Sequence, residues 1–109
     1  MHWIYAHFIG DYILQNDWMA RNKKIKIFPA LVHAITYCIP FLFCSLSWWQ
    51  IVLIGIQHYI QDRTNFIIWF MKIKGSEKFA TELGPWSVIL TDNIIHIFFI
   101  ALVVQFLAF

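Results

Sequence analysis

Long apolar stretches separated by short polar segments dominate the chain. Each stretch is close to the ~20 residues that an α-helix needs to cross ~30 Å of hydrocarbon. They predict four helices, at about residues 3–20, 27–45, 48–73 and 86–109. Pro29 falls in the first turn of the second helix, where its missing N–H is harmless, and Pro40 should kink that helix. The pattern predicts an all-α, polytopic membrane protein, a four-transmembrane-helix up-down bundle forming one domain over residues 1–109.

Composition points the same way. The chain is 61% hydrophobic and only 13% charged, with a mean hydropathy of +0.65, whereas soluble domains are about 45–50% apolar and about 25% charged. A soluble fold of 109 residues could not bury so many apolar side chains, because small domains hide only part of their surface. The net charge of +2 and the lack of a basic stripe exclude a nucleic-acid-binding protein. The N-terminus has no basic region before its apolar run, so no cleavable signal peptide is expected.

Loop charges predict the orientation in the membrane. The middle loop, residues 45–47, is uncharged, whereas the first and third loops are basic. The basic residues of these two loops are Arg21, Lys23, Lys24 and Lys26, and Lys72, Lys74 and Lys78. Because basic loops stay in the cytoplasm, both termini should face outward. For residues 75–84 a short interfacial helix and a solvated loop are both open.

Ionisable side chains lie inside the predicted helices, where they are costly and usually mark function. Six of them form three i,i+4 pairs: His7 with Asp11, His58 with Asp62, and Asp92 with His96. This spacing places both members of a pair on one helix face. In the fourth helix, which runs the other way, the order of the pair is reversed. All three pairs therefore put His at one level and Asp one turn, about 6 Å, nearer the cytoplasm, with His33 at a similar depth.

Imidazole and carboxylate groups are ligands of Zn and other divalent first-row metals, and facing helices of bundles build mono- or di-metal sites from such pairs. Without a cation, three buried carboxylates would repel one another and take up protons. The predicted ligands of a divalent metal of the Zn type are His7, Asp11, His58, Asp62, Asp92 and His96. His33, or an unligated Asp, would be the general base. Supporting hydrogen-bond partners are expected at Gln15, Gln61 and Asn93, with Gln57, Asn65 and Tyr37 as further candidates.

A family resemblance rests on these same residues. The run His7-x-x-Gly10-Asp11-x-x-x-Gln15, followed by Asp17, Met19-Ala20 and Lys23, resembles the opening motif of domain-of-unknown-function family 3307. His33, His58-x-x-x-Asp62 and Asp92-x-x-x-His96 match its later pattern, although Asn93 stands where Gln is expected and Arg63 lies only near an expected basic residue. The resemblance implies a small integral protein of the bacterial inner membrane with a polar core, and it implies no activity. At the level of fold and residue types, the pattern is also similar to bacterial membrane-bound metal-dependent hydrolases.

The leading hypothesis is a metal-dependent hydrolase that acts on a lipid or a lipid-linked phosphate or ester, with the metal activating water. Two alternatives stay open. The same side chains could form a proton or ion pathway, or they could be hydrogen-bonding groups in the core of a non-catalytic accessory membrane protein. The expected partners are the lipid bilayer and a lipid substrate, an oligomer is compatible with the sequence, and no nucleic acid is expected. The sequence leaves open the substrate, the reaction, and the identity and number of the metal ions.

Overall fold

The structure, a computed structural model, describes residues 1–75 and 85–106, and within these ranges it contains helices and no strand. This confirms the all-α prediction. The helix or loop expected for residues 75–84 lies outside the described residues apart from Gly75. In chain order the elements are α1 (Trp3–Phe8), the π-helix η1 (Ile9–Ile13), α2 (Asp17–Asn22), α3 (Ile27–Cys38), the 3₁₀-helix η2 (Ile39–Phe43), α4 (Trp48–Arg63), α5 (Phe66–Ile73) and α7 (Pro85–Phe106).

The first predicted helix, residues 3–20, is not continuous. α1 passes into η1, where Leu14 N donates to Ile9 O, five residues back, at 3.0 Å. Residues 14–16 are not helical, and α2 starts anew, with the side chain of Asn16 accepting a hydrogen bond from Met19 N at 2.9 Å. Asn is a favoured N-cap residue, so the break has a local cause that the apolar pattern concealed.

The third predicted helix, residues 48–73, is also divided. α4 begins with a capping box in which Ser47 and Gln50 bond reciprocally. It ends before Thr64, whose extended backbone (φ −111°, ψ 172°) turns the chain into α5. The second helix tightens into η2 around Pro40, where a kink was expected. The fourth predicted helix corresponds to α7, which is continuous over its 22 residues.

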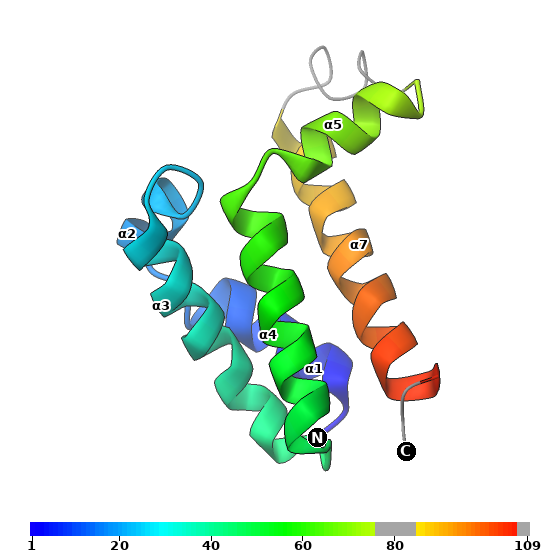
Figure 1. Cartoon of the computed structure of the whole chain (residues 1–109). Helices are drawn as coiled ribbons and strands as arrows, with labels where there is room; N and C mark the ends of the chain where they lie inside the picture. The colour runs from blue at the N-terminus through cyan, green and yellow to red at the C-terminus, as the bar shows by residue number, and fades with distance from the viewer. Residues whose placement is uncertain (76–84, 107–109) are drawn as a thin grey trace.

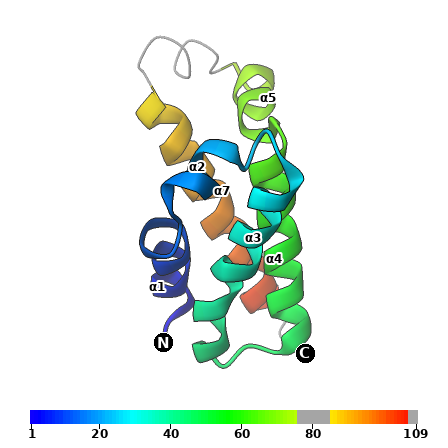
Figure 2. The same cartoon turned by 90° about the vertical axis from the view of Figure 1, so that its left-hand side faces the viewer.

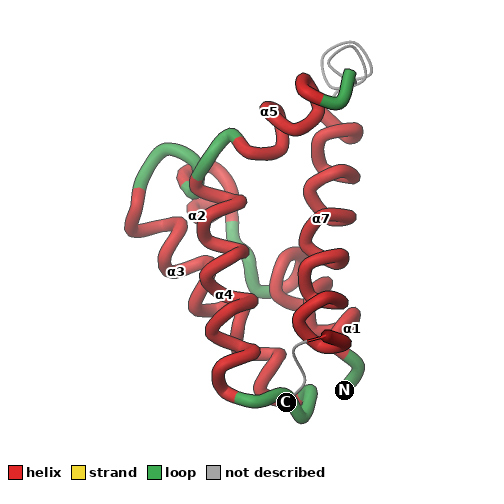
Figure 3. Tube along the Cα trace, turned by 45° about the vertical axis from the view of Figure 1, so that its right-hand side comes forward, coloured by secondary structure: helices red, strands yellow, loops and turns green. Residues whose placement is uncertain are grey.

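The longer helices run along one common direction, and α5 lies across one end of the bundle (Figure 1). α3 and α4 pack side by side, and α4 in turn contacts α7. α1 lies beside α7 at the opposite end from α5, and α2 lies near the α5 end (Figures 2 and 3). The N-terminus and the last described turn of α7 share one end of the bundle (Figure 1), which is the arrangement expected of an up-down bundle.

The interior is unusually polar and the surface unusually apolar. Towards the end of the bundle that holds the N-terminus, a hydrophobic cluster joins α1, α3, η2, α4 and α7. Its residues are Ala6, Tyr37, Phe41, Ile54, Ile100 and Val103. The remaining buried positions include many polar and charged side chains, whereas large hydrophobic side chains are exposed along every helix, such as Leu42 (66%) and Phe98 (63%). Among the described residues, one helix, over Trp86–Gln105, is long and apolar enough to cross a membrane alone, and Ile27–Phe43 is a shorter apolar helix.

Gly10 allows the π-helix to approach α3. A Cβ atom at this position would lie 2.6 Å from Tyr37 Cδ2 and 3.2 Å from Tyr37 Cα. The second of these contacts is with backbone, which cannot rotate away. The absence of a side chain at Gly10 therefore sets how closely η1, and with it Asp11, packs against α3.

We predict that Gly10→Ala destabilises the protein, because overpacking of this kind costs about 1–3 kcal/mol. Thermal unfolding in detergent, followed by circular dichroism, should show a lower Tm. Ile13→Ala is the matched control, since Ile13 lies on the same element and is 73% exposed. Equal Tm values for wild type and Gly10→Ala would contradict the close packing of η1 on α3.

Candidate metal centre

Four buried side chains from three elements converge at the centre of the bundle. Asp11 comes from η1, His33 from α3, and His58 and Asp62 from α4; none is more than 7% exposed. Their ligand atoms all lie within 4.8 Å of one another, close enough to hold a metal ion. α4 supplies two of them because i,i+4 residues share a helix face.

Five of the six separations between the four ligand atoms are close to those around a tetrahedral metal. His33 Nε2 lies 3.2 Å from both Asp11 Oδ1 and Asp62 Oδ2. His58 Nε2 lies 3.4 Å from Asp11 Oδ1, 2.9 Å from Asp62 Oδ2 and 2.8 Å from His33 Nε2. In a regular tetrahedron, corners about 3.2 Å apart surround a point about 2.0 Å from each corner, which is the usual Zn–N and Zn–O distance.

The donor set also has the chemistry of a cation site. Two imidazole nitrogens and two carboxylate oxygens are borderline ligands suited to Zn and its neighbours. Asp62 Oδ2 is buried and has no partner in hydrogen-bonding geometry despite its close nitrogen neighbours. A buried polar atom normally has such a partner; the close neighbours of this oxygen include a cation, the ammonium of Lys23, whose Nζ lies 3.1 Å away.

A second group of ligand atoms adjoins the first and includes α7. Asp11, Asp92 and His96 also have ligand atoms within 4.8 Å of one another. His96 Nε2 lies 3.5 Å from Asp92 Oδ2 and 3.4 Å from Asp62 Oδ1. The side chain of Asp92 is the most accessible of these, at 22% exposure. Asp11 thus belongs to both groups.

Aromatic stacking fixes the ring of His58. The centroid of its ring lies 3.7 Å from the ring centroid of Tyr37, at an interplanar angle of 15°. It lies 4.2 Å from the ring centroid of His96, at an interplanar angle of 24°. His58 is thereby held between α3 and α7, with its Nε2 edge directed at the carboxylates. Rotation of the ring would require both neighbours to move.

His7, a predicted ligand, lies at the margin of the cluster. Its Nδ1 bonds with Tyr37 Oη at 2.6 Å and its Nε2 with Asn93 Oδ1 at 2.9 Å. The nearest carboxylate oxygen, Asp11 Oδ2, is 3.9 Å from His7 Nε2, and His7 is in neither group of candidate ligands. Both ring nitrogens are engaged by neutral groups, so the geometry places His7 as a neighbour of the centre.

The predicted supporting residues have distinct positions. Gln61 Nε2 donates to Asp92 Oδ1 at 2.8 Å and to Asp92 O at 3.0 Å, and Gln57 Nε2 donates to Gln61 Oε1 at 2.5 Å. Gln57 Oε1 in turn lies 3.4 Å from His96 Nδ1. Gln15 reaches only the backbone oxygen of Asp11, at 3.2 Å. Gln61 and Gln57 of α4 therefore hold the side chains of Asp92 and His96 on α7.

Lys23, which the sequence placed in a loop, reaches into the cluster. Its Nζ lies 3.1 Å from Asp62 Oδ2. Burial lowers the pKa of Lys23, but the charges of Asp62 and Asp11 outweigh this and hold that pKa above its ordinary value. The next residue fixes the loop: Lys24 Nζ donates to Asp62 O and Thr64 O, each at 3.1 Å, at the end of α4.

The six predicted ligands and His33 are thus all in or beside one cluster. The structure differs from the sequence prediction at His33. Its Nε2 atom stands among the ligand atoms of the four-residue group, which favours the role of a metal ligand over that of a general base. Sequence reasoning missed Lys23 as a neighbour of the carboxylates. Its position six residues after Asp17, beside a helix end, has no periodic pattern, and its place in the family's opening motif was the signal that could have identified it.

A comparison with protein families settles the affiliation of the chain. The model of the family described as "Protein of unknown function (DUF3307)" matches residues 1–109. The chain belongs to this family. Neither the curated proteins nor the solved structures that were compared contain a match to it. Membership confirms the resemblance seen in the motifs, and it brings no activity with it.

We predict that Tyr37→Phe destabilises the protein without removing a metal ligand. The substitution leaves His7 Nδ1 buried without its bond to Tyr37 Oη, and an unsatisfied buried polar group costs about 1–3 kcal/mol. The Tm measured in detergent should fall while the metal content stays unchanged. Tyr5→Phe, at a residue that is 63% exposed, is the control. Loss of bound metal in Tyr37→Phe would show that Tyr37 does more than support His7.

Proposed function

We propose that this protein is an integral membrane enzyme that hydrolyses a phosphate or carboxylic ester of a lipid or lipid-linked compound. A divalent metal, of the Zn type, would be held by Asp11, His33, His58 and Asp62. The observation that carries the proposal is the convergence of two imidazole nitrogens and two carboxylate oxygens, all buried and within 4.8 Å of one another, at the meeting point of η1, α3 and α4.

The distribution of side chains supports a location in the bilayer, with four crossings and both termini outside. Exposed apolar side chains surround an interior that contains, among the described residues, nine buried polar or charged residues beside its hydrophobic cluster, and large exposed apolar surface is typical of a site of membrane contact. At ~1.5 Å per residue, α7 is about 33 Å long and α4 about 24 Å. The broken segment from α1 to α2 is compatible with this topology, because irregular backbone is tolerated at membrane depth where protein covers it.

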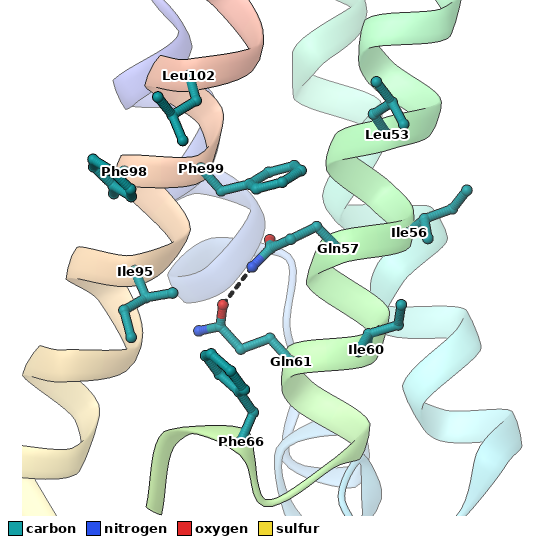
Figure 4. A pocket seen from close by; sticks show the side chains of 10 residues that line it. All are labelled: Leu53, Ile56, Gln57, Ile60, Gln61, Phe66, Ile95, Phe98, Phe99 and Leu102. Carbon is teal, nitrogen blue, oxygen red and sulfur yellow. Dashed lines mark hydrogen bonds between the residues drawn. The ribbon is translucent and has the colours of Figure 1, made fainter. Parts of the chain in front are cut away.

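An apolar groove beside the cluster supports a lipid substrate. It lies between α4 and α7 and has a volume of about 440 Å³, within the range of about 300–1,000 Å³ typical of ligand sites. Its walls are hydrophobic except for Gln57 and Gln61, which reach from α4 towards α7 (Figure 4). Since Gln61 donates to Asp92, a hydrocarbon chain in this groove would end next to the candidate centre.

A second, more polar cleft supplies a place for the head of such a substrate. It has a volume of about 330 Å³ and is lined by Lys23, Lys24, Asp62 and Asp92, together with residues of α5 and the first turns of α7. Gln61 lines the groove and Asp92 lines the cleft, so their hydrogen bond lies between the two. Lys23 is the charged group that would contact a phosphate in this cleft.

The chemistry follows from these positions. A divalent cation polarises a phosphoryl or carbonyl oxygen and makes water a better nucleophile near neutral pH. Hydrolysis joins the water oxygen to phosphorus or to the acyl carbon, breaks the bond to the leaving oxygen, and transfers a water proton to that oxygen. The chain would orient the ester through the groove, the cleft and Lys23, and the surrounding apolar helices would limit the access of bulk water.

We predict that protein purified in detergent without chelators contains a first-row divalent metal, measured by elemental analysis. Asp62→Asn should weaken metal binding by more than about tenfold, because it replaces a direct ligand and even supporting residues are worth about 10–100-fold. Asp17→Asn is the matched control, since Asp17 is exposed on α2. Circular dichroism would verify that both variants fold.

Activity is tested separately, with long-chain phosphate and carboxylic esters in detergent micelles and short-chain esters of the same head group as controls. The proposal expects metal-dependent release of product from a long-chain ester. A folded wild type that binds neither Zn nor Mn would overturn the metal centre and favour a proton pathway or a structural polar core. Tight metal binding without hydrolysis of any ester would overturn the proposal that the protein is a hydrolase.

A further inference from the structure

We infer that the centre holds two metal ions: one at the four-residue group, and a second bound by Asp92 and His96 and bridged to the first by Asp11 and Asp62. This inference rests on the proposed metal centre and adds a second site to it. The two groups of candidate ligands share Asp11, and carboxylate-bridged pairs of metals are a known use of helical-bundle interiors.

The two oxygens of Asp62 face different imidazoles. Asp62 Oδ2 lies 2.9 Å from His58 Nε2 and 3.2 Å from His33 Nε2, on the side of the first group. Asp62 Oδ1 lies 3.4 Å from His96 Nε2, on the side of α7. A carboxylate that presents one oxygen to each of two sets of nitrogens has the geometry of a bridge between two ions.

Asp11 is oriented in a comparable way. Its Oδ1 atom faces His33 and His58, at 3.2 Å and 3.4 Å. Its Oδ2 atom is directed towards His7, at 3.9 Å, and the residue also has a ligand atom within 4.8 Å of those of Asp92 and His96. Asp11 lies on η1, between α3 and α7, which is where a bridging residue has to be.

The hydrogen bonds of His96 determine which of its nitrogens is free to bind. Its Nδ1 atom lies 3.4 Å from Gln57 Oε1, an acceptor, so Nδ1 carries a proton and Nε2 is the atom left to bind a metal. Nε2 faces Asp62 Oδ1 and Asp92 Oδ2 at 3.4 Å and 3.5 Å. A cation between these three atoms would contact all of them in place of a second ring proton.

The other carboxylate oxygen of Asp92, Oδ1, already accepts a hydrogen bond. Gln61 Nε2 donates to Asp92 Oδ1 at 2.8 Å, which fixes the carboxylate so that Oδ2 faces His96. This is the arrangement usually found around metal ligands, in which a neighbouring polar group orients the ligand. Gln57 and Gln61, bonded to each other, thus orient both ligands that α7 contributes.

The charge balance identifies the class of substrate that suits two ions. Three carboxylates, of Asp11, Asp62 and Asp92, together with the ammonium of Lys23, give the cluster a net charge of −2 while the imidazoles are neutral. One divalent ion neutralises this charge, and a second leaves an excess of +2. A phosphate monoester dianion in the cleft beside Lys23 would compensate that excess, so the pair of ions favours a lipid phosphate over a carboxylic ester.

The test is the stoichiometry of metal binding to wild type and to His96→Ala in detergent, titrated with Mn²⁺ or Zn²⁺. Two equivalents in wild type and one in His96→Ala would support the second site. The control is Ile94→Ala on the same helix, since Ile94 is 55% exposed; it should bind as wild type does. One equivalent in both proteins would overturn the second site and leave the proposed single-metal centre standing, whereas no binding in wild type would overturn both.

A second measurement on the wild type does not depend on how the variant folds. Bridged ions lie about 3.5–4 Å apart, so two Mn²⁺ ions should give the electron paramagnetic resonance spectrum of a spin-coupled pair. The spectrum of isolated Mn²⁺ at full loading would overturn the bridged arrangement, even if two equivalents bind.

Discussion

The structure depends on the burial of several ionisable groups in a bundle whose outer surface is apolar. Asp11, His33, His58, Asp62 and His96 are all at most 7% exposed. Transfer of a carboxylate out of water is expensive unless it is paired and hydrogen-bonded, or coordinates a metal. Within the chain, the ammonium of Lys23, 3.1 Å from Asp62 Oδ2, and the amide of Gln61, which donates to Asp92 Oδ1, compensate part of this charge. The need to compensate this charge connects the fold of the chain to its chemistry.

Local departures from regular helix serve this centre. Asp11 lies within the π-helix, and Gly10 lets this segment lie against Tyr37; single-turn π-helices often occur at functional sites. The loop before α3 is fixed to the end of α4 by Lys24, which leaves Lys23 directed at Asp62. The irregular backbone thus lies close to the charged side chains that it positions.

The sequence predicted the composition of the cluster better than its surroundings. The i,i+4 pairs depend only on helical periodicity, which survives small errors in helix ends, and so Asp11, Asp62 and Asp92 could be assigned to one level of the bundle, with their paired histidines one turn away. The breaks at residues 14–16 and at Thr64 were missed although each falls in a short polar run, residues 15–17 and 61–65, because the apolar stretches on either side of each run were joined into one helix. The approach of Lys23 to Asp62 and the different surroundings of His7 and His33 depend on packing between helices that are distant in sequence.

The arrangement of protons argues against a purely structural polar core. In such a core each buried lone pair would face a donor. Here His33 Nε2 and His58 Nε2 are 2.8 Å apart, and both nitrogens also face the oxygens of Asp11 and Asp62, which only accept. If each ring donates from Nε2 to a carboxylate, two N–H groups meet at 2.8 Å, whereas one cation at the centre would contact all four atoms. At His96, Gln57 accepts the Nδ1 proton and Nε2 faces two carboxylates, where a cation would take the place of a second ring proton.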